Sequence, residues 1–195
     1  MMLRSVNQNA FSNPLFRFKE NGITIEYTGN VAGDTGILFA TGETYTAVDE
    51  TMLRAMNIVT DDYTKVVTTM VTDIDQLFNI SDFNQNINSW DVSNVTSMRR
   101  LFFRANKFNQ SLFAWDVSNV TNMELMFRNN TVFNQDISNW NTSGATNMNS
   151  MFQNASVFNQ DLSGWCVSQF ATEPTVFSTD ATAWVLPKPN WGAPC

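Results

Sequence analysis

The chain has 195 residues, of which 43% are hydrophobic, so it can bury a substantial core. Its formal net charge of -7 argues against a nucleic-acid partner, and the lack of histidine excludes histidine triads and imidazole metal sites. No apolar run approaches the roughly 18 residues that span a bilayer, and the N-terminus lacks the apolar core of a secretory signal. We therefore expect no membrane insertion.

The first 70 residues show no repeat. Aromatic residues without a period occur among polar ones in residues 1–19, which predicts an extended N-terminal arm. Residues 20–70 predict a small cap of mixed α+β type. The alternation in GITIEYTG indicates a strand, and Gly42-Glu43 suits a hairpin between Ile37-Leu38-Phe39 and Tyr45-Thr46-Ala47-Val48. Asp49 then suits the N-cap of a short helix that continues to Met56.

A unit of about 25 residues recurs over residues 71–169. The units begin at Val71, Val95, Val120 and Ala145, which makes them 24, 25, 25 and 25 residues long. Each contains a V-T-x-M-x-x-M-F phrase, an FNQ triplet and a tryptophan. A fixed period of this length is typical of solenoids, and the leucine-rich repeat is the class that fits. We expect an α/β solenoid, a leucine-rich-repeat-like right-handed coil of four units.

Within each unit, the first phrase has helical spacing of its apolar residues and predicts a short helix or 3₁₀ turn. The FNQ-x-I-x-x-W phrase suits a strand, and these strands would stack in parallel in successive units. The asparagine of the triplet should form a structural ladder that satisfies buried backbone groups. Its members are Asn84, Asn109, Asn134 and Asn159.

Residues 170–195 contain most of the prolines and predict an irregular C-terminal cap. The only cysteines are Cys166, at the end of the last unit, and Cys195, the final residue. They are either two unrelated thiols or a disulfide, and their placement favours a disulfide that ties the tail over the end of the solenoid. Such a bridge would contribute roughly 3 kcal/mol and would indicate an oxidising environment.

The phrases FNQDISNW, WDVSNVTNM and WCVS, with the closing PKPNWGAPC, resemble the BspA-like leucine-rich repeat surface proteins. This family is bacterial, with members in some protists and phages. The resemblance implies non-catalytic repeats that are displayed on cell surfaces and take part in adhesion. The chain differs in having a short array, no export signal and no cysteines near Tyr27 and Val67, where the family often carries them. These differences suit a component of a phage particle.

Carboxylate ladders are too shallow to predict a metal site. Asp91 and Asp116 recur at one position, but Asn141 replaces the carboxylate in the third unit and Asp161 has a different offset. Stacked carboxylates can bind Ca²⁺. We instead expect these residues to cap the turns that follow them.

The residues that interrupt the repeat are the candidate binding site. Five of the chain's 11 cationic residues fall in two adjacent units, at solvent-facing offsets. Three apolar residues stand at positions that are polar in other units. The candidate patch consists of Arg99, Arg100, Phe103, Arg104, Lys107, Phe113, Leu125 and Arg128. It is either a solubilising face or a surface for an acidic glycan or an acidic partner.

The sequence therefore predicts a non-enzymatic recognition or adhesion module without a cofactor. It would be displayed outside the cell or on the exterior of a particle, and would bind a protein or glycan. The alternative is a virion structural protein, a decoration, tail or fibre component held by the N-terminal arm.

Overall fold

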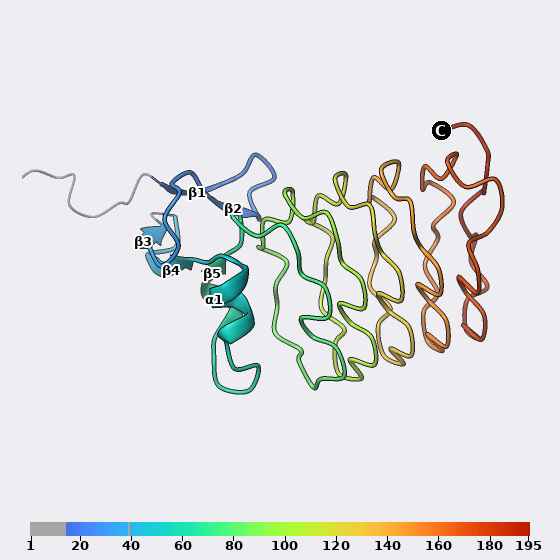
Figure 1. Cartoon of the computed structure of the whole chain (residues 1–195), viewed down its shortest axis with the longest axis horizontal. Helices are drawn as coiled ribbons and strands as arrows, with labels where there is room; N and C mark the ends of the chain where they lie inside the picture. Colours follow the sequence, from blue (N-terminus) through green and yellow to red (C-terminus); the bar gives the residue numbers. More distant parts are fainter. Residues whose placement is uncertain (1–14, 39) are drawn as a thin grey trace, which may run out of the picture.

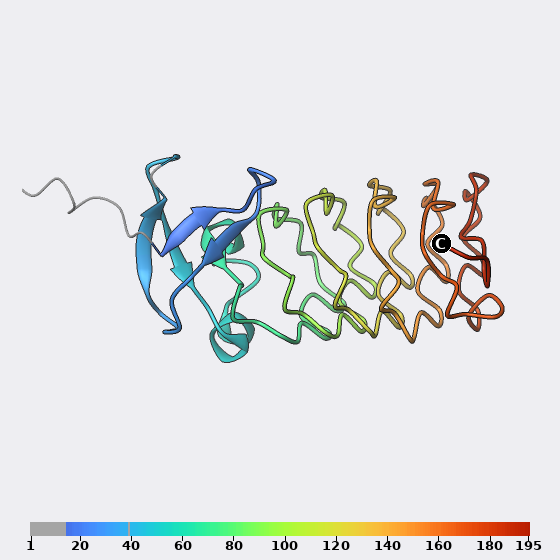
Figure 2. The ribbon, with the colours of Figure 1, turned by 90° about the horizontal axis from the view of Figure 1, so that it is seen from above.

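The computed structural model describes residues 15–38 and 40–195. A small sheet region lies at the N-terminal end, and turns of the repeating chain follow it side by side in both views (Figures 1 and 2). The predicted arm over residues 1–19 lies outside the described residues up to position 14.

The first sheet pairs β1 (Phe16–Phe18) with β2 (Ile25–Tyr27) in antiparallel register. At one end of this sheet Phe16 contacts Tyr27, and their ring centroids are 4.9 Å apart. Both side chains are buried. The sequence placed Phe16 and Phe18 in an extended arm, whereas the structure places them in this sheet because burial of the Phe16 ring anchors the segment.

The second sheet contains β3 (Thr35–Leu38), β4 (Glu43–Ala47) and β5 (Val66–Val67). Strands β3 and β4 are antiparallel, which confirms the predicted hairpin, and β5 joins β4 in parallel. Gly42 closes the hairpin with φ 71°, a left-handed conformation that glycine adopts without strain.

The predicted short helix is also confirmed. Helix α1 (Glu50–Ala55) begins after Asp49, whose carboxylate accepts a hydrogen bond of 2.8 Å from the backbone N–H of Met52. A 3₁₀ turn, η2 (Tyr63–Lys65), then leads into β5.

The repeating part is built from turns, not from the predicted helix and strand of each unit. Beyond β5, the described residues form no helix, and their only β-pairing is a series of parallel bridges. These bridges join Asp73, Ser97, Asn122 and Asn147, in the phrase that we expected to be helical. The parallel order is as predicted, but the pairing lies in the V-T-x-M phrase rather than in FNQ.

Left-handed residues explain why this phrase has helical spacing without a helix. Each unit has two such residues, four positions apart, for example Gln76 with φ 60° and Ile80 with φ 53°. They separate successive tight turns. In the first unit, one such turn is closed by a hydrogen bond from the N–H of Leu77 to the carbonyl of Ile74. Apolar residues return to the interior at nearly the helical interval, so periodicity alone did not separate the two structures.

Backbone hydrogen bonds join neighbouring units in both directions. The N–H of Thr96 donates back to the carbonyl of Thr72 at 2.9 Å, whereas the segment with the left-handed residues donates to the next unit. The N–H of Phe102 donates to the carbonyl of Met126 at 2.9 Å, and the N–H of Phe127 donates to that of Met151 at 2.9 Å. The N–H of Phe152 donates in the same way to Phe177, at 2.8 Å. These hydrogen bonds between units thus extend into the segment that the sequence assigned to the C-terminal cap.

The interior is a continuous aromatic cluster. Phenylalanines one unit apart stack in two columns, with centroid separations of 5.4–5.8 Å in one and 6.0–6.1 Å in the other. The tryptophan Nε1 atoms donate to carbonyls of the preceding unit, as Trp115 does to Ile87 at 3.0 Å. Stacked aromatic pairs add about 1 kcal/mol each beyond the burial of their area. The columns are Phe78, Phe102, Phe127 and Phe152, and Phe83, Phe108, Phe133 and Phe158.

The asparagine ladder is present at the surface. The Oδ1 atom of Asn84 accepts from the N–H of Asn109 at 3.1 Å and from Nε2 of Gln110 at 3.0 Å. Asn109 and Asn134 repeat this arrangement with the next units. Asn159 instead accepts from the N–H groups of Val185 and Leu186. We expected buried backbone groups, whereas most of these asparagines are solvent-exposed.

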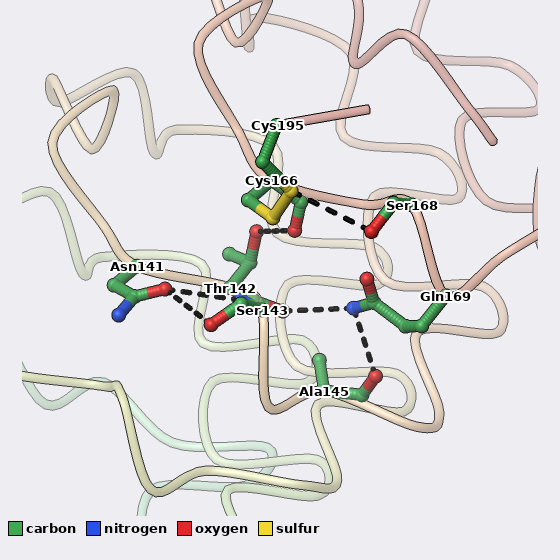
Figure 3. Close-up of a disulfide and its surroundings, with 8 residues drawn as sticks. All are labelled: Asn141, Thr142, Ser143, Ala145, Cys166, Ser168, Gln169 and Cys195. Atoms are coloured by element: carbon green, nitrogen blue, oxygen red, sulfur yellow. Dashed lines mark hydrogen bonds between the residues drawn. A yellow bond between two sulfur atoms is a disulfide. The ribbon is translucent and has the colours of Figure 1, made fainter. Parts of the chain in front are cut away.

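Specific contacts hold both ends of the array of repeat units. At the N-terminal end, the guanidinium of Arg54 on α1 donates to the carbonyls of Asp75 at 2.9 Å and Asp73 at 3.3 Å. At the other end, Cys166 and Cys195 form a disulfide with a Cα–Cα distance of 5.1 Å (Figure 3). The bridge ties the last residue to the fourth unit, and the hydroxyl of Thr142 in the third unit donates to the carbonyl of Cys166 at 2.8 Å.

Candidate functional site

Three arginines of the predicted patch surround one phenylalanine. The guanidinium carbons of Arg100, Arg104 and Arg128 lie 5.7, 5.3 and 5.9 Å from the ring centroid of Phe103. Cations at such distances are attracted by the negative face of an aromatic ring. We refer to these four residues as the arginine cluster.

The tight turns of the second and third units bring the cluster together. Arg100 and Arg104 occupy the two left-handed positions of the second unit, with φ 57° and 54°, and Phe103 lies between them. Arg128 comes from the third unit, where its carbonyl accepts a hydrogen bond of 3.0 Å from the N–H of Arg104. Stacking of neighbouring units therefore places a third guanidinium beside the pair.

The positive charge of the cluster is not neutralised within the part of the chain that the structure describes. None of the five ion pairs found there involves Arg100, Arg104 or Arg128. The Nε atoms of Arg100 and Arg128 are buried without an acceptor. Three adjacent cations without a carboxylate form a site to which an anionic group would be attracted.

The other predicted patch residues lie apart from the cluster or are paired. Arg99 bonds to Glu124 at 3.3 Å, and Lys107 is exposed. Leu125 is only 5% exposed, so it belongs to the interior and offers no apolar surface, contrary to our expectation. Phe113 lines a separate pocket with Ile23, on the side of the repeats that the N-terminal sheet approaches.

The turn between β1 and β2 packs against the first two units. Lys19 donates to the carboxylate of Asp91 at 2.7 Å and to the hydroxyl of Ser93 at 2.9 Å. Asp91 is almost fully buried. Burial opposes its ionisation, but the hydrogen bonds from Lys19 and Ser93 prevail and lower its pKa. Sequence reasoning missed this pair because Lys19 lies outside the repeats.

Two adjoining hollows lie beneath this turn. The larger, of about 610 Å³, lies between β1, β2 and the first two units. The smaller, of about 340 Å³, is lined by Ile23, Phe113 and polar side chains that include Asp116 and Asn141. Asn21 and Asp116 line both hollows.

The recurring carboxylates cap turns, as the sequence predicted. The Oδ1 atoms of Asp91, Asp116 and Asp161 each accept from the backbone N–H two residues later, at 3.2, 3.1 and 2.9 Å. The hydrogen bond from the Ser163 hydroxyl lowers the pKa of Asp161. Across the described residues, no three His, Cys, Asp or Glu side chains gather where they would hold a metal ion.

A family model described as "Mycoplasma protein of unknown function, DUF285" matches residues 72–191. The chain belongs to the DUF285 family. No curated protein and no solved structure matches the chain. The segment shared with the DUF285 family contains the units, the arginine cluster and Cys166, whereas the N-terminal sheets and Cys195 lie outside it.

Two further findings bear on where this DUF285 protein is found. In the described ranges, no helix has the length and apolar character to cross a membrane. The disulfide between Cys166 and Cys195 indicates an oxidising environment.

Proposed function

We propose that this DUF285 protein is a non-catalytic recognition module, displayed on an exterior surface, that binds a partner carrying anionic groups. In this proposal the turns form a leucine-rich-repeat-like right-handed solenoid that serves as a rigid scaffold. The parallel bridges between units and the stacked aromatic columns support that description. An acidic glycan is the partner that we would test first.

The observation that carries the proposal is the arginine cluster. In a chain with net charge -7, three guanidiniums share one ring and have no carboxylate partner among the described residues. Bringing like charges together is unfavourable, and a bound anion would relieve the repulsion. Arginine also binds sulfate and carboxylate groups through two parallel N–H bonds, which a solubilising lysine would not provide.

The test uses heparin, a sulfated polysaccharide, as the probe. The protein should bind immobilised heparin, and Arg104→Gln should elute at lower salt because one guanidinium is lost. Arg17→Gln is the matched control, since it makes the same change of charge at an exposed arginine of β1, outside the cluster.

Equal elution of the two variants would contradict the proposal. So would a lack of heparin binding together with stable association with a virus particle. That result would favour the alternative role as a structural component of a virion.

A further inference from the structure

We infer that the 340 Å³ pocket at Phe113 is a second binding site, one that accepts a neutral sugar ring. This inference extends the proposed recognition function to a different face and ligand. Its size lies within the range of roughly 300–1,000 Å³ that is typical of small-molecule sites.

Two apolar residues that line the pocket, Phe113 and Ile23, are not part of the core. The Phe113 side chain is 50% exposed, and the Ile23 side chain across from it on the N-terminal turn is 40% exposed. The positions equivalent to Phe113 in the other units hold Asn88, Ser138 and Ser163. The fold therefore does not need an aromatic residue here, and the exposed ring is available to stack on the C–H face of a sugar.

The polar wall offers the acceptors and the donor that sugar hydroxyls need. One oxygen of Asp116 caps the turn at Ser118, which leaves the other free among the described residues. The oxygen of Asn141 accepts from Ser143, so its amide NH₂ remains available. Asn139 uses its NH₂ on the carbonyl of Phe113 at 2.8 Å and keeps its oxygen free. A hydroxyl both donates and accepts, so it matches such a mixed set.

The charge of the lining favours a neutral ligand. Asp116 is the only ionisable side chain among the residues that line this pocket, and its carboxylate would repel an anion. The arginine cluster thus favours an anionic ligand, whereas this pocket favours a neutral one. The pocket also adjoins the 610 Å³ hollow through Asn21 and Asp116, which leaves room for a second sugar ring.

The test is saturation-transfer NMR with neutral probes: the methyl glycosides of glucose, galactose, mannose and N-acetylglucosamine, together with neutral disaccharides. At least one probe should bind with millimolar affinity. Phe113→Ser should weaken it by about tenfold or more, because the stacking surface is lost. The fold should tolerate this change, since the next unit has Ser138 at the same position.

A second variant, Asn141→Asp, replaces the free NH₂ by a carboxylate and should also weaken sugar binding. Asp91 and Asp116 occupy the equivalent position in earlier units, so this variant should fold as well. Arg104→Gln is the control and should leave sugar binding unchanged.

The inference would be overturned if no probe bound, if Phe113→Ser bound as well as the unaltered protein, or if only peptides bound in this pocket. These results would not affect the heparin experiment. If Arg104→Gln lost heparin binding but no sugar bound the protein, the pocket at Phe113 would be refuted and the arginine cluster would not. If a sugar bound but Arg104→Gln kept its heparin binding, the arginine cluster would be refuted and the pocket would not.

Discussion

Replacing Ile80 by asparagine should stabilise the protein. Ile80 has φ 53°, in the left-handed region, although its side chain is branched at Cβ. Left-handed backbone costs an L-residue about 1–2 kcal/mol, and asparagine adopts it more readily. The equivalent positions of the third and fourth units hold Asn129 and Asn154, with φ 57° and 59°.

Little is lost to offset this gain. The Ile80 side chain is 64% exposed, so the substitution removes little buried apolar area. Its N–H donates to the carbonyl of Phe103 at 2.8 Å, and a side-chain change retains this bond. We expect Ile80→Asn to raise the free energy of unfolding by about 1 kcal/mol, and the melting temperature by about 2–4 °C for a chain of this size.

Thermal and urea unfolding followed by circular dichroism would measure the effect. Ile80→Val is the matched control, because it keeps the branched Cβ in the same conformation and should leave stability within about 0.5 kcal/mol. If Ile80→Asn were no more stable than Ile80→Val, the strain assigned to this position would be wrong.

Two further predictions concern the ends of the repeats. Replacing Cys166 and Cys195 by serine should cost about 3 kcal/mol, because the tail loses its covalent tie; mass spectrometry of the unreduced protein should show no free thiol, and finding two would contradict the bridge. The lowered pKa of Asp91 means that its contribution to stability is present above the ordinary aspartate pKa near 4 and is lost as pH falls through the lower folded-state value. Asp91→Asn should therefore flatten the acid limb of a stability–pH curve, and an unchanged limb would refute the role of the Lys19–Asp91 pair.

Much of the architecture could be predicted from the sequence because phenylalanine and tryptophan recur at fixed positions of the interior. The repeat period alone makes Phe78 and Phe102 equivalent, and both lie in the core. Local signals were equally direct in the cap. Gly42 marked the hairpin and Asp49 marked the start of α1, since turns and helix caps depend on residues close in the chain.

The secondary structure within each unit could not be predicted from the sequence. A series of tight turns with left-handed residues brings side chains inward at almost the helical interval, so Ile74 and Phe78 read as a helical face. The residue types mark these turns inconsistently. Asn129 and Asn154 favour a left-handed backbone, but Ile80 and Arg104 at other such positions do not.

The candidate sites show the same division. The sequence by itself determined which residues depart from the repeat, including Phe103, Phe113 and Leu125. Only the tertiary structure decided what each one does: Leu125 is buried, Phe103 lies among three arginines, and Phe113 faces a pocket under a turn that begins near Lys19. A period specifies which residues are equivalent, whereas the surroundings of an exceptional residue depend on chain segments distant in sequence.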